Sequence, residues 1–581
     1  YRYVHDKDFS SWKNNICIPA DDGDEAIHAE QADRGSDTLL LKNTSQPRLG
    51  FRVNKIYIDS YYMDPQTKKY PEANRELMKQ FNEGMLVFNY IGHNDPEVGF
   101  TGEGLFSRYE MDHLTNTRLP LFITITCDYC QFDAEDVSAG ENVFLNPSAG
   151  AIALITTTRV VYTDGNDKIN QRLMKRLLER DSNGSPLRIG DVLKLAKQDF
   201  NTEIDKNKLN YVLIGDPALK LAYPEHSIQV TRINGNSGEK NIEMIPGKNY
   251  TVEGEIRSHQ NELLSDFNGY IYYNLYDKEK QFTTLAHQDK KTWTYTHRPD
   301  LLTTGKGTIQ NGTFRITVTL PIDNSHSGKS GLLNLYAYDE SGREANGYTD
   351  KLIVSTAVEP ITEDIQGPDI KFAGINDDSF TEGILVNNPA TFVCKFSDPS
   401  GIWNGNSLGK QMTLSLDGAC IEENVARYYK PIAESKIPEG EFIYPLPRLS
   451  NGLHTLTFKV FDTLGNSSEV TIAFEVKENS ETYTISLEEE PATERATISC
   501  QDQNGNDVTE SKHTRISVTN TLGEEIWSYE TTENNPFPLT WNLQDNNGKR
   551  VSAGQYYCKG YFETSAGTIV TPAKKIVVIT Q

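Results

Sequence analysis

A histidine and a cysteine stand at the ends of two apolar runs in the first part of the chain. The run at residues 85–90 leads into Gly92 and His93. The run at residues 121–126 leads directly into Cys127, 34 positions after His93. Because a thiolate is a strong nucleophile and an imidazole can take its proton, this pair predicts nucleophilic attack on a carbonyl group. An isolated histidine or cysteine is usually structural, so the prediction depends on the pairing of the two.

Three carboxylates follow the first apolar run of the chain. Asp21, Asp22 and Asp24 lie there, in the sequence DDGD. One of them could orient the His93 ring and stabilise its protonated form, as the third member of a catalytic triad does. Carboxylates clustered around a glycine also fit a solvated turn, or a loop that binds a structural Ca²⁺ ion. The residues alone leave these alternatives open.

Cys127 and Cys130 are also spaced as a CxxC pair. A metal site is disfavoured because no second CxxC or HxxxH sequence lies near enough to complete four ligands. A thioredoxin-like redox pair is disfavoured because that motif begins a helix, whereas bulky Tyr129 and Phe132 follow Cys127. The chain has seven cysteines, so at least one thiol stays unpaired whatever disulfides form.

Alternating strand and helix patterns surround these residues up to about residue 222. Six apolar runs predict strands, at residues 16–20, 55–59, 85–90, 121–126, 151–156 and 211–214. Helical periodicity lies between them, for example at residues 72–82 and 168–180. Continuous apolar strands are typical of a mainly parallel sheet covered by helices on both faces, in which reactive groups follow the carboxyl ends of the strands.

After residue 223 the pattern changes to short alternating strands separated by Asn-Gly, Asp-Gly and Ser-Gly turns. This pattern predicts consecutive β-sandwiches, with linkers near residues 362–368 and 477–482. A strand, an Asn-Gly turn and a second strand predict a hairpin over residues 541–562. The chain is therefore divided into an α/β domain at 1–222, a β-sandwich at 223–362, an immunoglobulin-like sandwich at 363–479 and a small immunoglobulin-like domain at 480–581.

Composition excludes several classes of function. The 57 basic and 81 acidic residues leave a formal charge of −24, which argues against binding nucleic acid or an anionic membrane through basic patches. No run of about 18 apolar residues predicts a helix that spans a membrane. The chain begins at Tyr1 without an initiator methionine or a secretory signal, which fits a piece of a longer protein.

Four segments resemble one known family of enzymes. NYIGH, LPLFITITCDYCQFD, GAIALITTTR and YVLIGDPALKL have the order and spacing found in the gingipain-type cysteine peptidases, whose catalytic domain has a caspase-like α/β fold. The resemblance covers about residues 12–221. It implies that Cys127 is the nucleophile, that His93 is the general base and that Asp22 is the orienting acid, with Asp21 and Asp24 as alternatives.

The resemblance also implies an oxyanion hole and a substrate pocket. The backbone N–H groups of Cys127 and Asn94 would form the hole, and Tyr162 would form part of the pocket wall. Two positions depart from the family pattern, since Asn94 and Cys130 both stand where glycine is usual. The acidic residue that gives some members a preference for arginine has no match near residues 25–29, so that preference is not implied.

Within the family, the chain most resembles the members that act as sortases of the type IX secretion system. This implies an enzyme that cleaves the C-terminal sorting domain from secreted cargo through a cysteine thioester and transfers the cargo to an amine of anionic lipopolysaccharide. An outer-membrane β-barrel protein would be a further partner, attachment to the extracellular face of the outer membrane would be peripheral, and no cofactor would be required. Two alternatives are a surface endopeptidase that only hydrolyses, and a non-catalytic adhesin or assembly protein with a degenerate peptidase domain.

Overall fold

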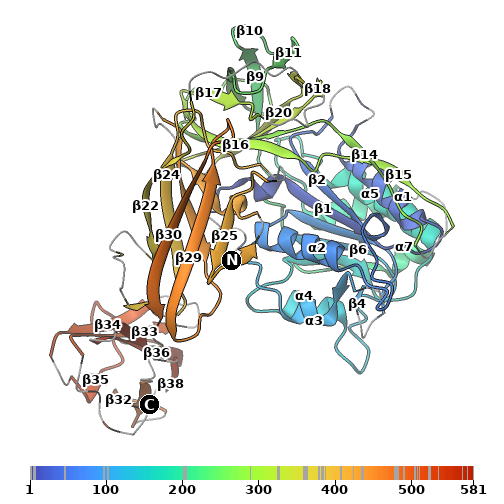
Figure 1. The fold of residues 1–581 in the computed structure, drawn as a ribbon. Helices are drawn as coiled ribbons and strands as arrows, with labels where there is room; N and C mark the ends of the chain where they lie inside the picture. Colours follow the sequence, from blue (N-terminus) through green and yellow to red (C-terminus); the bar gives the residue numbers. More distant parts are fainter. Residues whose placement is uncertain are drawn as a thin grey trace.

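The computed structural model places an α/β domain beside three β domains (Figure 1). The structure describes Tyr3 and residues 8–579, except for 43, 45–46, 96–98, 101–103, 200–205, 288–289, 323–327, 357–363, 377–379, 381–384, 387, 406–408, 423, 433–436, 477–482, 489–490, 503–505, 507, 509–510, 521–524, 534–535, 565–566 and 572. The predicted linker at 477–482 therefore lies outside the described residues, as do residues 362–363 of the linker at 362–368, whereas residues 364–368 are described.

The α/β domain is built on a six-stranded sheet with the order β2-β1-β3-β6-β7-β8. The strands are β1 Asn15–Ala20, β2 Arg52–Tyr57, β3 Val87–Ile91, β6 Leu121–Ile125, β7 Ala153–Thr157 and β8 Tyr211–Ile214. All neighbours are parallel except β7 and β8. The predicted mainly parallel sheet is confirmed, and its strands lie within a few residues of the predicted apolar runs.

Helices cover both faces of this sheet because successive strand residues point to opposite sides. Ile16 and Ile18 pack on one face with α1 Ile27–Leu39, α5 Thr163–Leu177 and α6 Ile189–Gln198. Cys17 between them packs on the other face with α2 Pro71–Glu83, α3 Arg108–Asp112 and α4 Ala139–Leu145. The short elements of the domain are β4 Gly99–Phe100, β5 Phe106–Ser107, α7 Lys206–Asn210 and the 3₁₀ turns Ser11–Asn14 and Ile58–Ser60.

The second domain is an eight-stranded sheet with antiparallel neighbours, which closes on itself through a parallel pairing of β9 with β20. Its order is β10-β9-β12-β17-β16-β13-β19-β20, with β9 His226–Ile233, β10 Asn236–Ser237, β12 Asn249–Arg257, β13 Gly269–Tyr276, β16 Leu301–Gln310, β17 Thr313–Thr319, β19 Leu332–Asp339 and β20 Glu344–Thr349. A smaller sheet contains β11 Ile242–Met244, β18 Lys329–Ser330 and β21 Leu352–Val354. The closed sheet differs from the two separate sheets of the predicted sandwich, because strand patterns give the strands but not the pairing of their edges.

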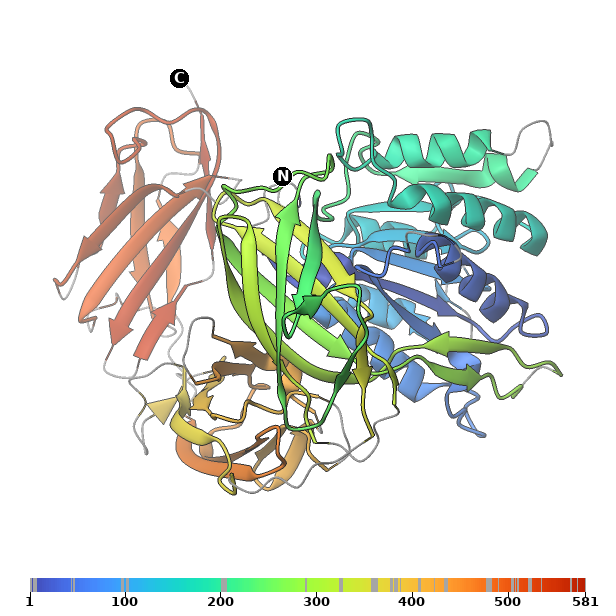
Figure 2. The same cartoon turned by 90° about the horizontal axis from the view of Figure 1, so that it is seen from above.

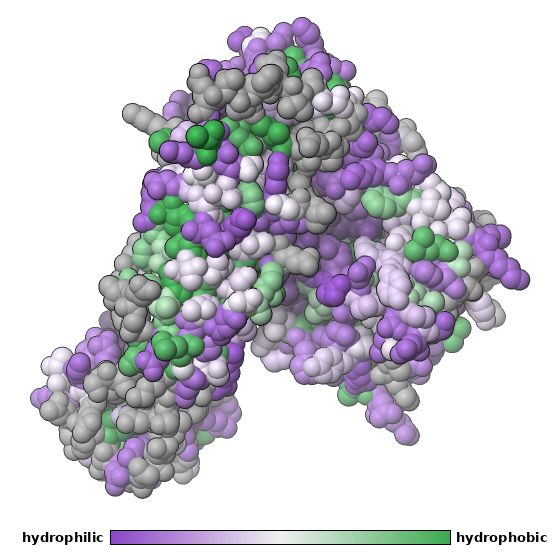
Figure 3. Space-filling model, in the orientation of Figure 1, coloured by the Kyte–Doolittle hydropathy of each residue, from purple (hydrophilic) through white to green (hydrophobic). Residues whose placement is uncertain are grey.

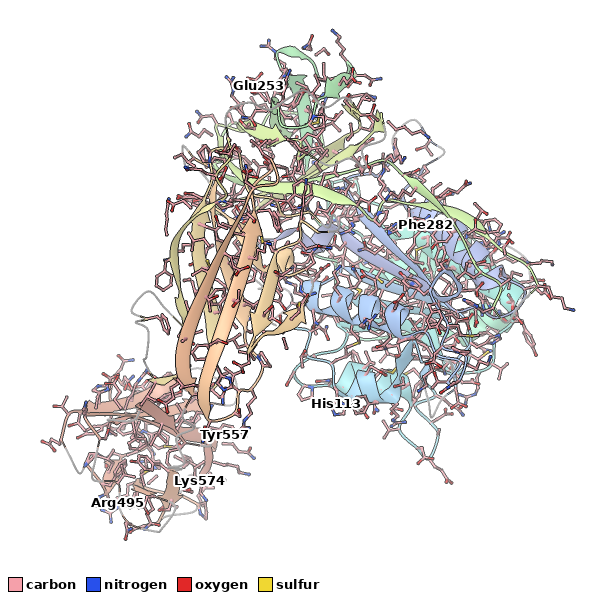
Figure 4. All side chains as sticks on the ribbon, viewed as in Figure 1. His113, Glu253, Phe282, Arg495, Tyr557 and Lys574 are labelled. Atoms are coloured by element: carbon pink, nitrogen blue, oxygen red, sulfur yellow. The ribbon has the colours of Figure 1, made fainter. Side chains whose placement is uncertain are left out.

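A long hairpin of the second domain, β14 Lys280–Thr283 and β15 Thr294–His297, reaches over the α/β domain (Figure 2). Its Tyr295 is part of the hydrophobic core of the α/β domain, and Phe282, which is labelled in Figure 4, packs against the same core. At the hairpin tip, the buried carboxylate of Asp59 accepts the N–H groups of Ala286 (2.6 Å) and His287 (2.9 Å). The hairpin therefore joins the two domains into one packed unit.

The third and fourth domains each contain two facing sheets around one core. The third has the sheet β22 Asp369–Ile375, β24 Thr391–Ser397, β28 Glu439–Pro445 and β27 Tyr429–Pro431, and the sheet β23 Leu385–Val386, β30 Ser467–Val476, β29 Gly452–Phe461, β25 Thr413–Leu416 and β26 Ala419–Glu422, with a 3₁₀ turn at Ala426–Tyr428. The fourth has β31 Thr484–Leu487, β32 Ala496–Gln501 and β35 Leu539–Trp541 in one sheet, and β34 Glu525–Thr531, β33 His513–Asn520, β36 Gly554–Thr564, β37 Gly567–Val570 and β38 Lys574–Val578 in the other. These sheets confirm the predicted β-rich region after the α/β domain.

The hairpin predicted over residues 541–562 is wrong. β35 pairs with β32 and β36 pairs with β33, so the two strands belong to different sheets. The Asn-Gly sequence instead closes a local turn, in which Asp545 Oδ1 accepts the N–H groups of Asn547 and Lys549, both at 2.9 Å. The Asn-Gly sequence therefore forms a turn, as predicted, but this turn does not join two paired strands.

Candidate active site

The three predicted reactive segments meet at one edge of the α/β sheet. β3 lies between β1 and β6, and all three run in the same direction, so the residues after them are neighbours. Asp21 follows β1, His93 follows β3 and Cys127 follows β6. The chain connections from β1 and β3 lead to opposite edges of the sheet, and in open α/β sheets such a reversal of strand order is where ligands usually bind.

Asp21 holds the backbone of the histidine loop. Its buried carboxylate accepts the backbone N–H of His93 through Oδ2 at 2.6 Å, and its Oδ1 contacts Nδ1 of the buried His28. Burial alone would raise the pKa of Asp21, but His28 and the N–H of His93 outweigh it and leave the pKa below its usual range. Gly92 has φ = 157°, and a Cβ there would lie 2.6 Å from Asp21 Oδ2, so the glycine before the histidine makes room for this carboxylate.

Asp24 is the carboxylate beside the His93 ring. Its Oδ2 lies 3.5 Å from His93 Nε2 and 3.7 Å from His28 Nε2. The two imidazole rings meet edge to face with centroids 4.9 Å apart. Gly23 permits this arrangement, because a Cβ there would lie 2.8 Å from Cδ2 of His93. His93 and Asp24 are both about half exposed, so this pair is accessible to substrate and water.

The expectation that Asp22 orients the His93 ring is corrected. Asp22 is buried, and its Oδ2 accepts the hydroxyl of Tyr70 at 2.7 Å. The carboxylates that contact His93 are those of Asp21, at its backbone N–H, and Asp24, beside its ring. His28, seven positions after Asp21, was not singled out from the sequence. Its position near the start of the first helix, shortly after the aspartates, is the sequence feature that could have identified it.

The Cys127 thiol is half-buried and donates to the backbone carbonyl of Val161 at 3.4 Å. Within the described part of the chain it makes no hydrogen bond to the His93 ring. The side-chain amide of Asn94 donates to the carbonyl of Cys127 at 3.1 Å and so joins the two loops. The backbone N–H groups of Cys127 and Asn94 have no hydrogen-bond acceptor among the described residues, so both remain available to a developing oxyanion.

Cys130 differs from Cys127 in its position and in its burial. It is buried on the opposite face of the sheet, its N–H donates to the carbonyl of Thr157 at 3.0 Å, and burial raises the pKa of its thiol to about 11. Gly140 packs against it, since a Cβ there would lie 2.6 Å from Cys130 Cβ. All seven cysteines are free thiols. The CxxC spacing is therefore not a disulfide in this structure.

Exposed apolar side chains surround the edge that carries Cys127. Phe132 follows β6, and Val160 and Tyr162 follow β7, with Tyr162 exposed over 68% of its surface. Tyr162 is adjacent to Val161, whose carbonyl accepts the Cys127 thiol. The role of Tyr162 in a substrate pocket stays a prediction. The face of the molecule in Figure 3 is largely hydrophilic with separate apolar patches.

The DDGD loop does not form an all-oxygen site in this structure. Asp21, Asp22 and Asp24 face different partners, as described above. The group of described residues near the loop that could hold a metal comprises Asp21, His28 and His93, whose ligand atoms lie within 4.8 Å of one another. Two imidazoles and one carboxylate suit a transition metal better than Ca²⁺, which prefers oxygen ligands.

The fold and this site define a cysteine peptidase domain followed by β domains. Residues 1–222 match the family model described as Peptidase family C25. The gingipain-type resemblance found in the sequence is thereby confirmed. No curated protein sequence matches the chain.

Similar folds occur among solved structures. Dimeric latent PorU from Porphyromonas gingivalis aligns with 98% of this chain and 64% of its own length, at 18% identity and a TM-score of 0.32. The Arg-specific cysteine proteinase gingipain R (RgpB) aligns with 61% of this chain and 71% of its own, at 16% identity and a TM-score of 0.31. The fibronectin(III)-like modules of CbhA from Clostridium thermocellum align with 36% of this chain and 94% of their own, at 10% identity and a TM-score of 0.19. The chain thus spans just under two thirds of the length of PorU.

Proposed function

We propose that the α/β domain catalyses acyl transfer from a peptide bond, with Cys127 as the nucleophile and His93 as the general base. The observation that supports this most directly is the placement of both residues at the ends of neighbouring parallel strands, beside two backbone N–H groups that have no acceptor among the residues that the structure describes. The match of residues 1–222 to a peptidase family model agrees with it.

The reaction begins when His93 takes the proton of the Cys127 thiol. The sulfur attacks the scissile carbonyl carbon, and the carbonyl oxygen becomes an oxyanion that accepts the N–H groups of Cys127 and Asn94. One such donor typically contributes about 3–4 kcal/mol to catalysis. His93 then protonates the departing amine, the C–N bond breaks and a thioester remains on Cys127.

Productive geometry requires a rearrangement of two side chains. The thiol must leave the Val161 carbonyl, and the His93 ring must turn from Asp24 toward the sulfur. Catalytic hydrogen bonds are often loose before substrate binds and tighten in the complex. A peptide lying along Tyr162 would compete for the Val161 carbonyl and so release the thiol.

The acceptor of the acyl group decides the biological role. We propose an amine acceptor, as in the sortases of the type IX secretion system that the sequence motifs resemble. The substrate would be cargo carrying a C-terminal sorting domain, and the product would be cargo joined to an amine of anionic lipopolysaccharide. The enzyme would work on the extracellular face of the outer membrane, held peripherally by an outer-membrane β-barrel protein. Among the described residues, no helix is both long and apolar enough to cross a bilayer.

One experiment tests both the acyl transfer through Cys127 and the amine acceptor. Cargo with its C-terminal domain is incubated with the protein, with and without a glycine peptide as amine, and the products are weighed by mass spectrometry. We expect amide-linked product with the parent, none with Cys127→Ala, and parental yield with the matched control Cys130→Ala. Hydrolysed product alone would support a peptidase and contradict transpeptidase activity. Equal inactivity of the parent and Cys127→Ala would overturn the enzymatic function.

A further inference from the structure

Two histidines and two aspartates gather at the edge of the α/β sheet, where the loop after β1 meets the loop after β3. One ring nitrogen of His28, one of His93 and one oxygen of Asp21 lie within 4.8 Å of one another. Asp24 Oδ2 lies 3.7 Å from Nε2 of His28 and 3.5 Å from Nε2 of His93. Two ligands of a tetrahedral zinc ion are about 3.3–3.6 Å apart, because the bonds to nitrogen and oxygen are about 2.0–2.2 Å long. Both distances from Asp24 are close to this spacing.

Asp21 orients His28 as carboxylates orient zinc-binding histidines. Its Oδ1 accepts the N–H at Nδ1 of His28, so the lone pair of the ring stays on Nε2. Both side chains are buried, and the histidine stands in the first turn of α1. The ring therefore presents a ligand nitrogen toward Asp24 in a fixed direction. Asp21 is not counted as a ligand itself, because its Oδ2 already accepts the backbone N–H of His93.

The His93 ring has the orientation that a metal bound to His28 and Asp24 requires. It lies beside Asp24 and meets the His28 ring edge to face, with the ring centroids 4.9 Å apart. Among the described residues, Cys127 makes its hydrogen bond with the carbonyl of Val161 and none with this ring. The observed position of the ring thus agrees with metal binding, and not with proton transfer from the thiol.

The charges around the two rings also favour a cation. Within the described part of the chain, Asp21 and Asp24 have ion pairs with histidines and with no lysine or arginine. Two carboxylates therefore face two imidazoles that are neutral when they bind a metal. Asp24 and His93 are each about half exposed, so an ion can reach them from water and keep a water molecule as a further ligand.

We propose that His28, His93 and Asp24 bind one Zn²⁺ ion, with water as the fourth ligand. Two imidazoles and one carboxylate suit Zn²⁺, whereas Ca²⁺ and Mg²⁺ prefer oxygen ligands alone. The consequence for catalysis rests on the proposed function. The ion occupies Nε2 of His93 and holds the ring away from Cys127, so that the ring cannot turn and take the proton of the thiol. Zn²⁺ is thus a reversible inhibitor that binds the histidine pair and not the thiol.

Zinc titration of the full chain tests the site without reference to activity. The protein is treated with EDTA, dialysed and titrated with ZnCl₂ by isothermal titration calorimetry. We expect one Zn²⁺ ion more per chain for the parent than for His28→Gln, and the parental stoichiometry for Cys127→Ala. His113→Gln, at an exposed position at the end of α3, is the matched control and should bind as the parent does. Equal stoichiometry for the parent and His28→Gln would overturn the proposal.

Asp24→Asn separates loss of the site from loss of the fold. The position is half exposed, so this variant should melt at the temperature of the parent in EDTA. Its affinity for Zn²⁺ should fall by about tenfold or more, as is typical when a metal site loses a supporting carboxylate. With zinc in excess, the melting temperature should rise less for this variant than for the parent. A rise of equal size in both proteins would contradict the assignment of Asp24.

Co²⁺ in place of Zn²⁺ reports which atoms bind the metal. Nitrogen and oxygen ligands give weak bands in the visible range, whereas a thiolate ligand adds a strong charge-transfer band in the near ultraviolet. We expect the weak bands alone, and the same spectrum from the parent and from Cys127→Ala. A near-ultraviolet band that is present in the parent and lost in Cys127→Ala would place the metal on the thiol and overturn the proposed ligands.

Activity assays test the inhibition separately from the binding. Saturating Zn²⁺ should lower the rate of acyl transfer by the parent by about tenfold or more, because the general base is withheld, and EDTA should restore the rate. A parent that is inactive in EDTA would contradict the proposed function, while the titration would still decide the metal site. A parent that binds zinc as expected and keeps its full rate would overturn the inhibition.

Discussion

The backbone N–H of His93 donates to the buried carboxylate of Asp21 across 2.6 Å. The N–H of Asp21 in turn donates to the carbonyl of Ile91 at 3.2 Å, so the loops after β1 and β3 hold each other. The acid after the first strand therefore positions the histidine through its backbone, while Asp24 lies beside the ring. In the proposed mechanism, the two tasks that a triad acid usually combines would be divided between these two residues.

Replacement of Asp21 should therefore affect stability and activity together. Asp21→Asn loses the charge that faces His28 and the His93 N–H, which should lower the free energy of unfolding by about 2–4 kcal/mol and reduce kcat/KM by at least tenfold. Urea unfolding and peptidase assays measure the two effects.

The pH dependence gives Asp21 a distinct signature. Because its pKa is depressed in the folded state, its stabilising contribution is present above the unfolded value of about 3.9 and is lost as pH falls below it. The Asn variant should lack this part of the acid-induced loss. Asp24→Asn, at a half-exposed position, should retain the stability of the parent and lose only part of the activity. Loss of activity in Asp22→Asn at unchanged stability would restore Asp22 as the orienting acid.

Asn94 allows the oxyanion hole to be tested without changing the nucleophile. Asn94→Pro removes the backbone N–H and should reduce kcat by about 10²–10³-fold, as loss of one oxyanion donor does. Asn94→Ala keeps that N–H but loses the side-chain contact with the Cys127 carbonyl, so its kcat should fall by less than tenfold. Thermal unfolding of both variants checks the fold. Equal rates for the two would mean that this N–H does not serve the reaction.

Much of this site was predictable from the sequence because strand ends in a parallel sheet converge. The apolar runs before His93 and Cys127 placed both residues at one edge, and the structure brings β3 and β6 together as neighbours. The oxyanion donors, which the resemblance to the family implied, stay a prediction. Position along the chain was sufficient to place His93 and Cys127, because each follows the end of a strand.

The choice among the aspartates was not predictable, because it depends on side-chain direction within one loop. Asp24 has φ = 61°, in the left-handed region, and this turn brings its carboxylate back toward the His93 ring. Spacing alone gave no sign of that turn. The role of His28 depends on the same packing.

The closure of the second domain through β9 and β20 was not predictable for a related reason, since the pairing of edge strands leaves no mark on the periodicity of a strand sequence.

Thiol labelling should separate the seven cysteines into two groups. Cys127 is half-buried and Cys420 is exposed, so these two should react within minutes with a maleimide near pH 7.5. The others should react much more slowly, because they are buried; burial raises the thiol pKa of Cys130 to about 11 and those of Cys394 and Cys558 to about 12. Mass spectrometry of labelled peptides measures the rates. The Cys420→Ser variant isolates the Cys127 signal, and labelling of Cys130 as fast as Cys127 would contradict the proposed difference.

Acid should loosen the hairpin that joins the second domain to the α/β domain. His297 at the end of β15 lines a cavity of about 810 Å³ where the first three domains meet, together with residues of β2 and α2 and of β26 from the third domain. Burial, and then the charges of Arg52 and Lys55, lower the pKa of His297 to about 3. The folded protein therefore keeps this histidine neutral where the unfolded chain, with a pKa near 6.5, takes up a proton.

The sign of the effect follows from this difference. The contribution of His297 to the free energy of unfolding should be fully present above about pH 6.5. It should decrease as the pH falls, by up to about 2 kcal/mol at pH 5. Thermal unfolding from pH 7.5 to pH 5 should therefore show a smaller loss for His297→Gln than for the parent. His113→Gln, at an exposed position at the end of α3, is the matched control and should behave as the parent does. An identical pH dependence in all three proteins would show that His297 is not what makes the joined domains sensitive to acid.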